Sequence, residues 1–239
     1  MSFAKHIEHA GRKVGRSRAF CDFLTLAVCA LSAKQKEDEY LQVAKKYSSD
    51  EMMHFSKAFA CMVDDMNDSG EGLKDCLGDY FMDILSNERQ GQFFTPQPIC
   101  DFMAVITHTE NENPNTVNDC CCGSGRMLLA SAKINRFSKF YGADIDIQCC
   151  QMTLINLCLN GLFGVVSHMD TLRALEWRRW AVELHPLYLF PYIREIDLTI
   201  ADEIKEIPKT IPLPPEPKHE IKPIQTTLDS LFASVDLLI

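Results

Sequence analysis

The stretch between residues 116 and 143 carries a short strand pattern, a glycine-containing loop, an apolar helix pattern and a second strand pattern, in that order. A parallel strand is reached only through a crossover, which is usually a helix, so this order predicts a parallel pair. The alternation continues and predicts an α/β fold with a doubly wound sheet. Strands are expected at Thr116–Asn118, Phe140–Ala143 and Val165–His168 and, from weaker patterns, at Val182–Leu184 and Asp197–Ile200; helices are expected at Ile99–Ile106, Met127–Lys133 and Ile147–Leu159.

Residues 1–90 show the periodicity of amphipathic helices instead. Apolar side chains recur at i, i+3, i+4 and i+7, which places them on one helical face. We therefore expect a small N-terminal helical bundle over residues 1–90, packed on an α/β domain over residues 91–206. The apolar stripes run through Phe20, Phe23, Leu24, Ala27, Val28 and Leu31, through Met52, Phe55, Phe59, Met62, Val63 and Met66, and through Leu73, Leu77, Tyr80, Phe81, Ile84 and Leu85.

Residues 207–239 form a third region with a different composition. The proline-rich run IPKTIPLPPEPKHEIKP predicts an extended tail, because proline neither continues a helix nor pairs within a sheet. At the end of this tail, Gln225–Phe232 resembles the peptide by which replication proteins dock on sliding clamps. The alternative is a terminal helix that packs Leu228, Leu231 and Phe232 on the body of the protein. The sequence leaves both interpretations open.

The charge balance limits how this chain holds nucleic acid, because the net charge is −9. Proteins that grip DNA alone usually carry a basic face, since neutralised phosphates supply most of the affinity. Any DNA binding is therefore expected to be weak, salt-dependent and assisted by a partner subunit or an oligomer. The basic cluster, which is either a solvated helix face or a phosphate-contacting arm, comprises Lys5, Arg12, Lys13, Arg16 and Arg18.

The eleven cysteines favour neither disulfides nor a metal site. Residues 120–122 are consecutive cysteines and Cys149 and Cys150 are adjacent, whereas zinc sites need pairs two to four residues apart. We expect reduced cysteines that pack as small apolar residues, and no bound metal. The sequence shows no run of about eighteen apolar residues and no signal peptide, so a soluble cytoplasmic protein is expected.

Asp119, Gly123 and Gly125 mark the strongest local signal, a loop between a predicted strand and a predicted helix. The glycines allow a tight turn and let a ligand approach backbone amides at a helix N-terminus. Such a loop occurs in many nucleotide-binding folds and also in plain turns. The aspartate before it disfavours phosphate and favours a ligand with a cationic end.

Two more acidic residues follow predicted strands. Asp144 ends the second strand, where a carboxylate accepts hydrogen bonds from ribose hydroxyls, while the alternative role of helix cap suits Asp146 better. Asp170 follows the third strand, where a carboxylate can accept a hydrogen bond from an adenine amino group. Three acidic strand ends around one glycine loop predict a pocket for an adenosine that carries an amino-acid group, which is S-adenosylmethionine.

Four motifs resemble, in order, those of type I restriction-modification methylase subunits, which are adenine-N6 DNA methyltransferases. They are GQFFTP at 91–96 after LGDYFMDIL at 77–85, DCCCGSGRMLL from residue 119, GADIDIQCCQMTLINLCLNG from residue 142, and MDTL at 169–172. The resemblance spans residues 73–172. It implies a Rossmann-like S-adenosylmethionine-dependent methyltransferase sheet after the N-terminal helical bundle.

The resemblance also implies which residues bind the cofactor. Thr95 and Pro96 are expected at the methionine moiety, Asp119 and the two loop glycines at the amino-acid end, Asp144 at the ribose and Asp170 at the adenine. The complete implied set is Phe94, Thr95, Pro96, Asp119, Cys120, Gly123, Gly125, Asp144, Ile145, Asp170 and Thr171.

Active members of the family carry N-P-P-F or N-P-P-Y after the fourth strand, where this motif binds and stacks on the flipped target base. The nearest match here is HPLY at residues 185–188. His185, Pro186 and Tyr188 are therefore the candidate catalytic residues, with a neutral imidazole accepting one hydrogen bond from the target amine. The alternative is an apolar strand or turn that continues into LYLFPY.

Two further departures from the family bear on function. Arg126 takes the place of a second small residue, so restricted access to the loop is expected, and no long target-recognition region follows, as in short methylase-like proteins of phages and mobile elements. The sequence supports two functions: adenine-N6 DNA methylation of the restriction-modification type, or a catalytically inactive cofactor-binding partner or regulator of a DNA methylase or restriction system. Small-molecule methylation is a third function with less support.

Overall fold

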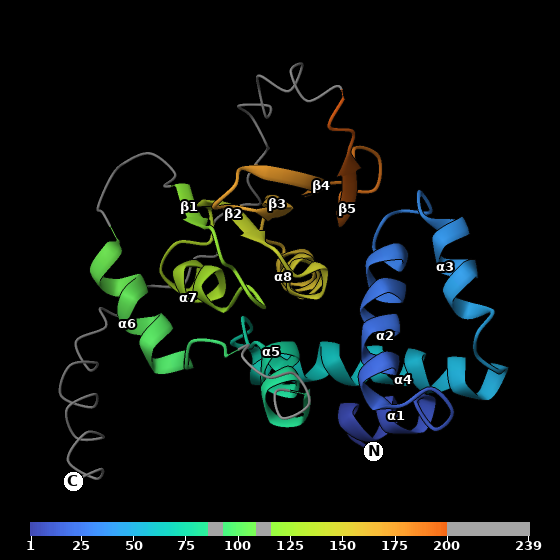
Figure 1. The fold of residues 1–239 in the computed structure, drawn as a ribbon. Coiled ribbons are helices and arrows are strands. Elements are labelled where there is room, and N and C mark those ends of the chain that lie inside the picture. Colours follow the sequence, from blue (N-terminus) through green and yellow to red (C-terminus); the bar gives the residue numbers. More distant parts are fainter. Residues whose placement is uncertain (86–92, 109–115, 200–239) are drawn as a thin grey trace, which may run out of the picture. The chain divides into compact units, whose positions relative to one another are not determined.

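The computed structural model of the chain describes residues 1–85, 93–108 and 116–199 (Figure 1). By their contacts, residues 1–201 form one compact unit, which holds all the helices and strands given below. The predicted proline-rich tail at residues 207–239 lies outside the described residues. No helix in the described ranges is long and apolar enough to cross a membrane.

A five-stranded mixed sheet is built from strands that lie side by side in chain order. β1, β2 and β3 are parallel, and β4 and β5 extend the sheet beyond β3 as antiparallel strands. The first three predicted strands are confirmed, and the predicted strand at 182–184 is part of β4. The bounds are β1 (Thr116–Asp119), β2 (Lys139–Asp144), β3 (Gly164–Asp170), β4 (Leu175–Leu184) and β5 (Pro191–Ile196).

The sheet is not doubly wound in its second half. The turn between Asp170 and Leu175 is too short for a crossover, so the chain reverses and β4 runs back along β3. The expected strand at Asp197–Ile200 is wrong over its described residues. The Asp197 carboxylate accepts a hydrogen bond from the Thr199 amide at 2.9 Å, and this local turn follows the end of β5.

Two helices connect the parallel strands. α7 (Arg126–Ile134) leads from β1 to β2, and α8 (Ile147–Leu159) leads from β2 to β3. Successive right-handed crossovers in the same direction place both helices on one face of the sheet. α7 packs on β1 and α8, and α8 packs on β2 through β5 (Figure 1). Both helices confirm the predictions, α8 with identical bounds.

α8 is apolar around most of its circumference because it lies between the sheet and α2 (Arg16–Ala30). Leu154, Ile155 and Leu157 are fully buried, and each such side chain stabilises the fold by about 1.5–3 kcal/mol. Asp146 caps the helix, since its carboxylate accepts a hydrogen bond from the Gln148 amide at 2.8 Å. The cap role thus belongs to Asp146, as the sequence suggests.

The N-terminal region is helical, as predicted. The first two apolar stripes lie on α2 and α4, but the third does not form one helix. Leu73 has a φ of 62°, and α5 begins only at Cys76, where the preceding Asp75 carboxylate accepts a hydrogen bond from the Gly78 amide at 2.9 Å. The stripes do not predict α1 and α3. The helices are α1 (Phe3–Ala10), α2, α3 (Glu37–Ala44), α4 (Ser49–Met66), a 3₁₀ turn (Asp68–Gly70), α5 (Cys76–Tyr80) and a π-helical turn (Phe81–Leu85).

The N-terminal helices and the sheet share one hydrophobic core. Phe20 of α2, Phe81 after α5 and Leu128 of α7 are fully buried members of the same cluster. β5 is also joined to the end of α2, where the Ile193 amide donates a hydrogen bond to the Leu31 carbonyl at 2.9 Å. The N-terminal helices and the sheet therefore pack as parts of one compact unit.

α6 (Gln97–Thr107) confirms the helix predicted at Ile99–Ile106. It begins after Pro96, with Pro98 in its first turn, where proline costs no helical hydrogen bond. Only Cys100 and Ala104 of this helix are buried, and α6 packs on α7. The rest of α6 borders a pocket or is exposed.

Candidate functional site

The carboxyl ends of β1, β2 and β3 lie at one edge of the sheet because these strands are parallel. Asp119 ends β1, Asp144 ends β2 and Asp170 ends β3. In the register, Asp119 lies beside Gly142, and Asp144 lies beside His168. The structure thus brings the three acidic residues to the same edge.

The loop from Cys120 to Gly125 turns the chain from β1 into α7. The Cys122 amide donates a hydrogen bond to the Ala143 carbonyl at 2.9 Å, and the Gly125 amide donates to the Cys122 carbonyl at 2.7 Å. Gly123 and Gly125 have φ values of 53° and 85°, a conformation that glycine alone adopts at little cost. The two glycines therefore shape the loop.

Close neighbours on both sides add a second reason for glycine in this loop. A Cβ on Gly123 would lie 3.0 Å from the ring of Phe94, and a Cβ on Gly125 would lie 3.1 Å from the side chain of Thr153. Phe94 is held in place by stacking on Phe81, with 5.0 Å between the ring centroids. The GQFFTP segment thus contacts the loop through Phe94, although the two motifs are far apart in the sequence.

Asp144 supports the same loop from the next strand. One carboxylate oxygen accepts a hydrogen bond from the Gly123 amide at 2.9 Å, and the other accepts from the Asp146 amide at 2.9 Å. A carboxylate offers about four acceptor positions, so two remain for other donors. Asp144 can hold the loop and still bind a pair of hydroxyl groups.

The environment of Asp119 disfavours the ionised form of its carboxyl group. Burial raises the pKa of its carboxyl group, and the nearby Asp144 carboxylate raises the pKa further. A hydrogen bond from the Cys121 amide at 3.1 Å opposes the rise. Within the described ranges, no basic side chain forms an ion pair with Asp119. A cationic ligand group would supply the missing partner.

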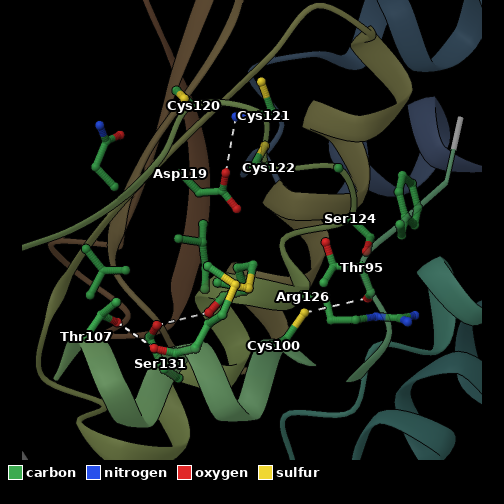
Figure 2. Close-up of a pocket in the computed structure, with 18 of the residues that line it drawn as sticks. Thr95, Cys100, Thr107, Asp119, Cys120, Cys121, Cys122, Ser124, Arg126 and Ser131 are labelled. Carbon is green, nitrogen blue, oxygen red and sulfur yellow. Dashed lines mark hydrogen bonds between the residues drawn. The ribbon is translucent and has the colours of Figure 1, made fainter. Parts of the chain in front are cut away.

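A pocket of about 620 Å³ lies beside this loop (Figure 2). Its volume falls in the range of small-molecule sites, about 300–1,000 Å³. Figure 2 shows Asp119 and the three loop cysteines in the upper part of the view, with Thr95 and Arg126 to their right. Of the predicted cofactor residues, Phe94, Thr95, Asp119, Cys120 and Gly123 line this pocket.

The other predicted cofactor residues do not line the pocket. They are Pro96, Gly125, Asp144, Ile145, Asp170 and Thr171. Thr171 is nevertheless tied to the loop, because its Oγ1 donates a hydrogen bond to the Cys120 carbonyl at 2.9 Å. Asp170 forms an ion pair with Arg173 at 3.6 Å. Asp144 and Asp170 therefore end the strands next to the pocket, whereas Pro96 precedes α6 and Gly125 precedes α7.

Asp75 is a buried residue at the site that the sequence does not single out. Its side chain is 1% exposed. One oxygen accepts hydrogen bonds from Ser124 Oγ and from Arg126 Nε at 2.9 Å, and the other accepts from Asn156 Nδ2 at 2.9 Å. Asp75 thus joins the start of α5 to the loop, to α7 and to α8.

The asparagines of the N-x-x-x-N-G segment complete this network. Asn156 Nδ2 also donates a hydrogen bond to the Ser124 carbonyl at 2.8 Å. Asn160 Oδ1 accepts from the Leu73 amide at 2.9 Å, and Asn160 Nδ2 donates to the Asn156 carbonyl at 2.8 Å. The two asparagines thus hold the glycine loop and the segment before α5 in place. The N-x-x-x-N-G spacing is the sequence signal that could have identified this role.

Arg126 does not close off the loop in the way its size suggests. Its guanidinium binds the carboxylates of Asp75 at 2.9 Å and Asp79 at 2.6 Å. The side chain lines the pocket but is held by these two carboxylates on the side of α5. The departure from a small residue therefore adds an ion pair between α5 and α7.

His185, Pro186 and Tyr188 lie in the turn between β4 and β5, away from this edge. β4 is antiparallel to β3, and Val182 near the end of β4 pairs with Gly164 at the start of β3. The turn therefore projects from the end of the sheet where β3 begins, whereas the glycine loop lies where the parallel strands end. The short turn after β3 is the physical cause, because it reverses the chain.

The 185–188 turn is ordered by contacts of its own. The His185 amide donates to the Phe190 carbonyl at 2.8 Å, and the Leu189 amide donates to the His185 carbonyl at 2.9 Å. The imidazole stacks on Phe190 at 5.2 Å, and Tyr188 is 71% exposed. The structure does not bring these catalytic candidates together with Asp119. They belong instead to the hairpin turn between β4 and β5.

The cysteines carry no disulfide, and all eleven are free thiols. Burial raises the pKa of Cys100 to about 11 and that of Cys158 to about 12, so both thiols stay protonated at neutral pH. Cys120 and Cys121 are exposed in the loop. Among the described residues, no group of three or more His, Cys, Asp or Glu side chains is placed to hold a metal ion.

Comparisons with known proteins match the part of the chain that carries this site. The family model described as N-6 DNA Methylase matches residues 73–186, just under half of the chain. The type I restriction enzyme MpnII methylase subunit of Mycoplasma pneumoniae is 29% identical over 120 residues, which cover 44% of this chain and 22% of that protein. The uncharacterized MG259 homolog of the same species is 28% identical over 134 residues, covering 50% of this chain and 30% of the relative. No solved structure matches.

These matches confirm the resemblance to the adenine-N6 methyltransferase family. The match to the family model begins at Leu73, so it includes Asp75 and Asp79 as well as the glycine loop. The matched part of this chain covers less than a third of the length of either relative.

Proposed function

We propose that this chain binds S-adenosylmethionine, or its demethylated product, at the carboxyl ends of β1–β3, and serves as the cofactor-binding part of an adenine-N6 DNA methylase of the restriction-modification type. The observation that carries the proposal is Asp119, a carboxylate with a raised pKa beside a second carboxylate and a glycine loop. The ammonium and sulfonium groups of this ligand are the cations that such a site stabilises.

The residues present fit this ligand. Asp119 would bind the ammonium group, and the open face of the loop at Gly123 would lie against the amino-acid end. Asp144 keeps two acceptor positions for the ribose hydroxyls. Asp170 and Thr171, at the end of β3, would flank the adenine. Three parallel strands with a glycine loop after the first support a Rossmann-like methyltransferase sheet in this part of the chain.

S-adenosylmethionine supplies an activated methyl group when it is bound, so the protein has only to bind, orient and exclude water. Phe94 covers Gly123 and is stacked on Phe81, which keeps solvent from one side of the loop. Thr95 extends this cover along the pocket. Asp75 and Arg126 hold the loop from beneath and take no part in the transfer.

The acceptor side of the reaction points to a partner. His185 and Tyr188 lie at the opposite end of β3 from the glycine loop, so they are poorly placed to hold a target adenine there. The net charge of −9 also disfavours DNA binding by this chain alone. We propose that a second subunit, or a further segment of a longer protein, supplies the target-base contacts and the DNA affinity. The alternative function is a regulator that binds the cofactor without transfer.

Two measurements test the proposal. Equilibrium dialysis with radiolabelled S-adenosylmethionine tests binding, and failure to retain label would refute the cofactor assignment. Transfer of labelled methyl to unmethylated DNA tests the division of roles. We expect no transfer by the chain alone and transfer when the other subunits of its restriction-modification system are present. No transfer in either mixture, with binding intact, would favour the regulator.

A further inference from the structure

Trp177 is an exposed aromatic residue at the edge of the sheet where the parallel strands end. In the register of β3 and β4, Met169 lies beside Glu176. His168 lies beside Arg178, so Trp177 is an extra residue in β4. Such a β-bulge turns a side chain away from the regular pleat and is common next to ligand sites. The bulge therefore places Trp177 at the carboxyl end of β3.

An ion pair holds this bulge in place. Arg179 Nε donates a hydrogen bond to Glu176 Oε1 at 2.8 Å, and Arg179 Nη2 donates to the second carboxylate oxygen. The two residues lie on either side of Trp177 in the sequence, so the bidentate pair fixes the backbone around it. Trp177 is thus positioned before any ligand binds.

The indole ring of Trp177 has a fixed neighbour and an open surface. Its centroid lies 4.8 Å from that of the His168 ring, and the two planes are inclined by 48°. His168 is itself held, because its Nε2 donates a hydrogen bond to the Ile145 carbonyl at 3.1 Å. Trp177 nevertheless remains 43% exposed. The indole can therefore accept a second ring.

The neighbours of Trp177 belong to the adenosine end of the proposed site. His168 lies beside Asp144 in the register. Asp170 lies beside Leu175, which is two residues before Trp177 in β4. Asp144 and Asp170 do not line the pocket beside the glycine loop. Another side chain is therefore needed to cover the nucleoside at this end of the ligand.

We propose that Trp177 binds the adenine ring of the ligand by stacking. A purine is flat and aromatic, and stacking on an exposed indole adds affinity without hydrogen bonds. Ile145, which is 61% exposed, would add an apolar contact in the same place. The stacking role rests on the proposed cofactor site, because only a ligand bound there brings adenine to Trp177.

Tryptophan fluorescence tests the proposal directly. The chain has two tryptophans, and Trp180 is 2% exposed, so Trp177 is the one that a ligand can reach. Because a stacked purine quenches indole emission, titration with S-adenosylhomocysteine should lower the emission of the intact chain. Trp177→Phe should bind the ligand without quenching, since only the buried Trp180 remains.

Calorimetry measures what the stack contributes to affinity. Trp177→Ala should weaken the binding of S-adenosylhomocysteine about tenfold, whereas Trp177→Phe keeps an aromatic ring and should keep most of the affinity. Phe190→Ala is the matched control, since Phe190 is also 43% exposed but lies in the turn between β4 and β5. The control should leave the affinity unchanged.

The outcomes separate the stacking role from the proposed function. Binding by the intact chain without quenching, together with equal affinity of Trp177→Ala, would overturn the stacking role and leave the cofactor site in place. The exposed indole would then be assigned to a contact with another protein. Failure of the intact chain to bind S-adenosylhomocysteine would overturn both proposals.

Discussion

The Nε of Arg126 lies 2.9 Å from the carboxylate of Asp75, and this buried ion pair joins the first residue of α7 to the residue before α5. The side chains are 10% and 1% exposed, respectively. Because Arg126 follows directly after the glycine loop, the pair fixes where that loop ends. The ion pair between Arg126 and Asp75 therefore helps to set the geometry of the glycine loop at the candidate site.

Removing the arginine should destabilise the protein strongly. Arg126→Met keeps the apolar stem but leaves the Asp75 carboxylate buried without its cation, which costs about 3–5 kcal/mol. Urea denaturation measures the change in the free energy of unfolding. Arg173→Met is the matched control, since Arg173 is 82% exposed in its pair with Asp170 and should change stability by less than about 1 kcal/mol. Similar losses in the two variants would contradict a structural role for Asp75.

Asp119→Asn should raise the stability of the ligand-free protein at neutral pH. The folded state raises the pKa of this carboxyl group, so the stability of the protein falls as the pH rises from the ordinary pKa of aspartate to the raised pKa, and stays lower above it. The cost disappears below the ordinary pKa of aspartate, where both states are protonated. The variant keeps an oxygen to accept from the Cys121 amide. Melting temperatures should therefore favour the variant at pH 7 and converge near about pH 3. Lower stability of the variant at pH 7 would contradict the raised pKa.

Gly123→Ala should weaken ligand binding through Phe94. A left-handed backbone costs a non-glycine residue about 1–2 kcal/mol, and the new Cβ would also press on the Phe94 ring at 3.0 Å. Gly161→Ala is the control, because its φ of 65° imposes the same strain with no atom within 4 Å of the new Cβ. Both variants should lose stability, but only Gly123→Ala should lose affinity for S-adenosylhomocysteine in calorimetry. Equal affinity of the two variants for S-adenosylhomocysteine would contradict a role for Phe94 in the binding site.

Tyr188→Ala should leave cofactor affinity unchanged. The residue is 71% exposed in the β4–β5 turn, and the turn projects from the other end of β3. If Tyr188 stacked on a target base, its loss would cost about 1–3 kcal/mol of DNA affinity in the presence of cofactor. Fluorescence anisotropy with an adenine-containing oligonucleotide measures that difference. A clear loss of DNA affinity would restore the catalytic assignment of the HPLY segment.

Local patterns were sufficient to predict α8 and the first three strands. The apolar run of α8 is bounded by a capping aspartate and by Gly161, and both boundaries act through contacts a few residues away. The three acidic strand ends could be predicted for the same reason, because parallel strands place their carboxyl ends together.

The direction of β4 and the role of Asp75 could not be predicted in this way. β4 reverses because of the short turn after β3. The doubly wound sheet expected from the sequence would instead have a crossover at that point. The assignment of HPLY as the catalytic motif depends on that crossover. Asp75 binds Ser124 and Asn156, which are 49 and 81 residues away in the sequence. Contacts over such separations leave no periodic pattern. The sequence signal that remains is the N-x-x-x-N-G spacing, which only the fold explains.

We propose that Asp119 binds the cationic amino-acid end of an adenosine ligand. Calorimetry should compare S-adenosylhomocysteine with 5′-methylthioadenosine, which keeps the nucleoside and the sulfur but lacks the amino-acid group. We expect the intact chain to bind S-adenosylhomocysteine at least about tenfold more tightly, a difference of about 1.4 kcal/mol. Asp119→Asn should remove most of that preference, while Asp64→Asn, at an exposed position on α4, should keep it. Equal affinity of the intact chain for the two ligands, or binding of neither, would contradict this role of Asp119.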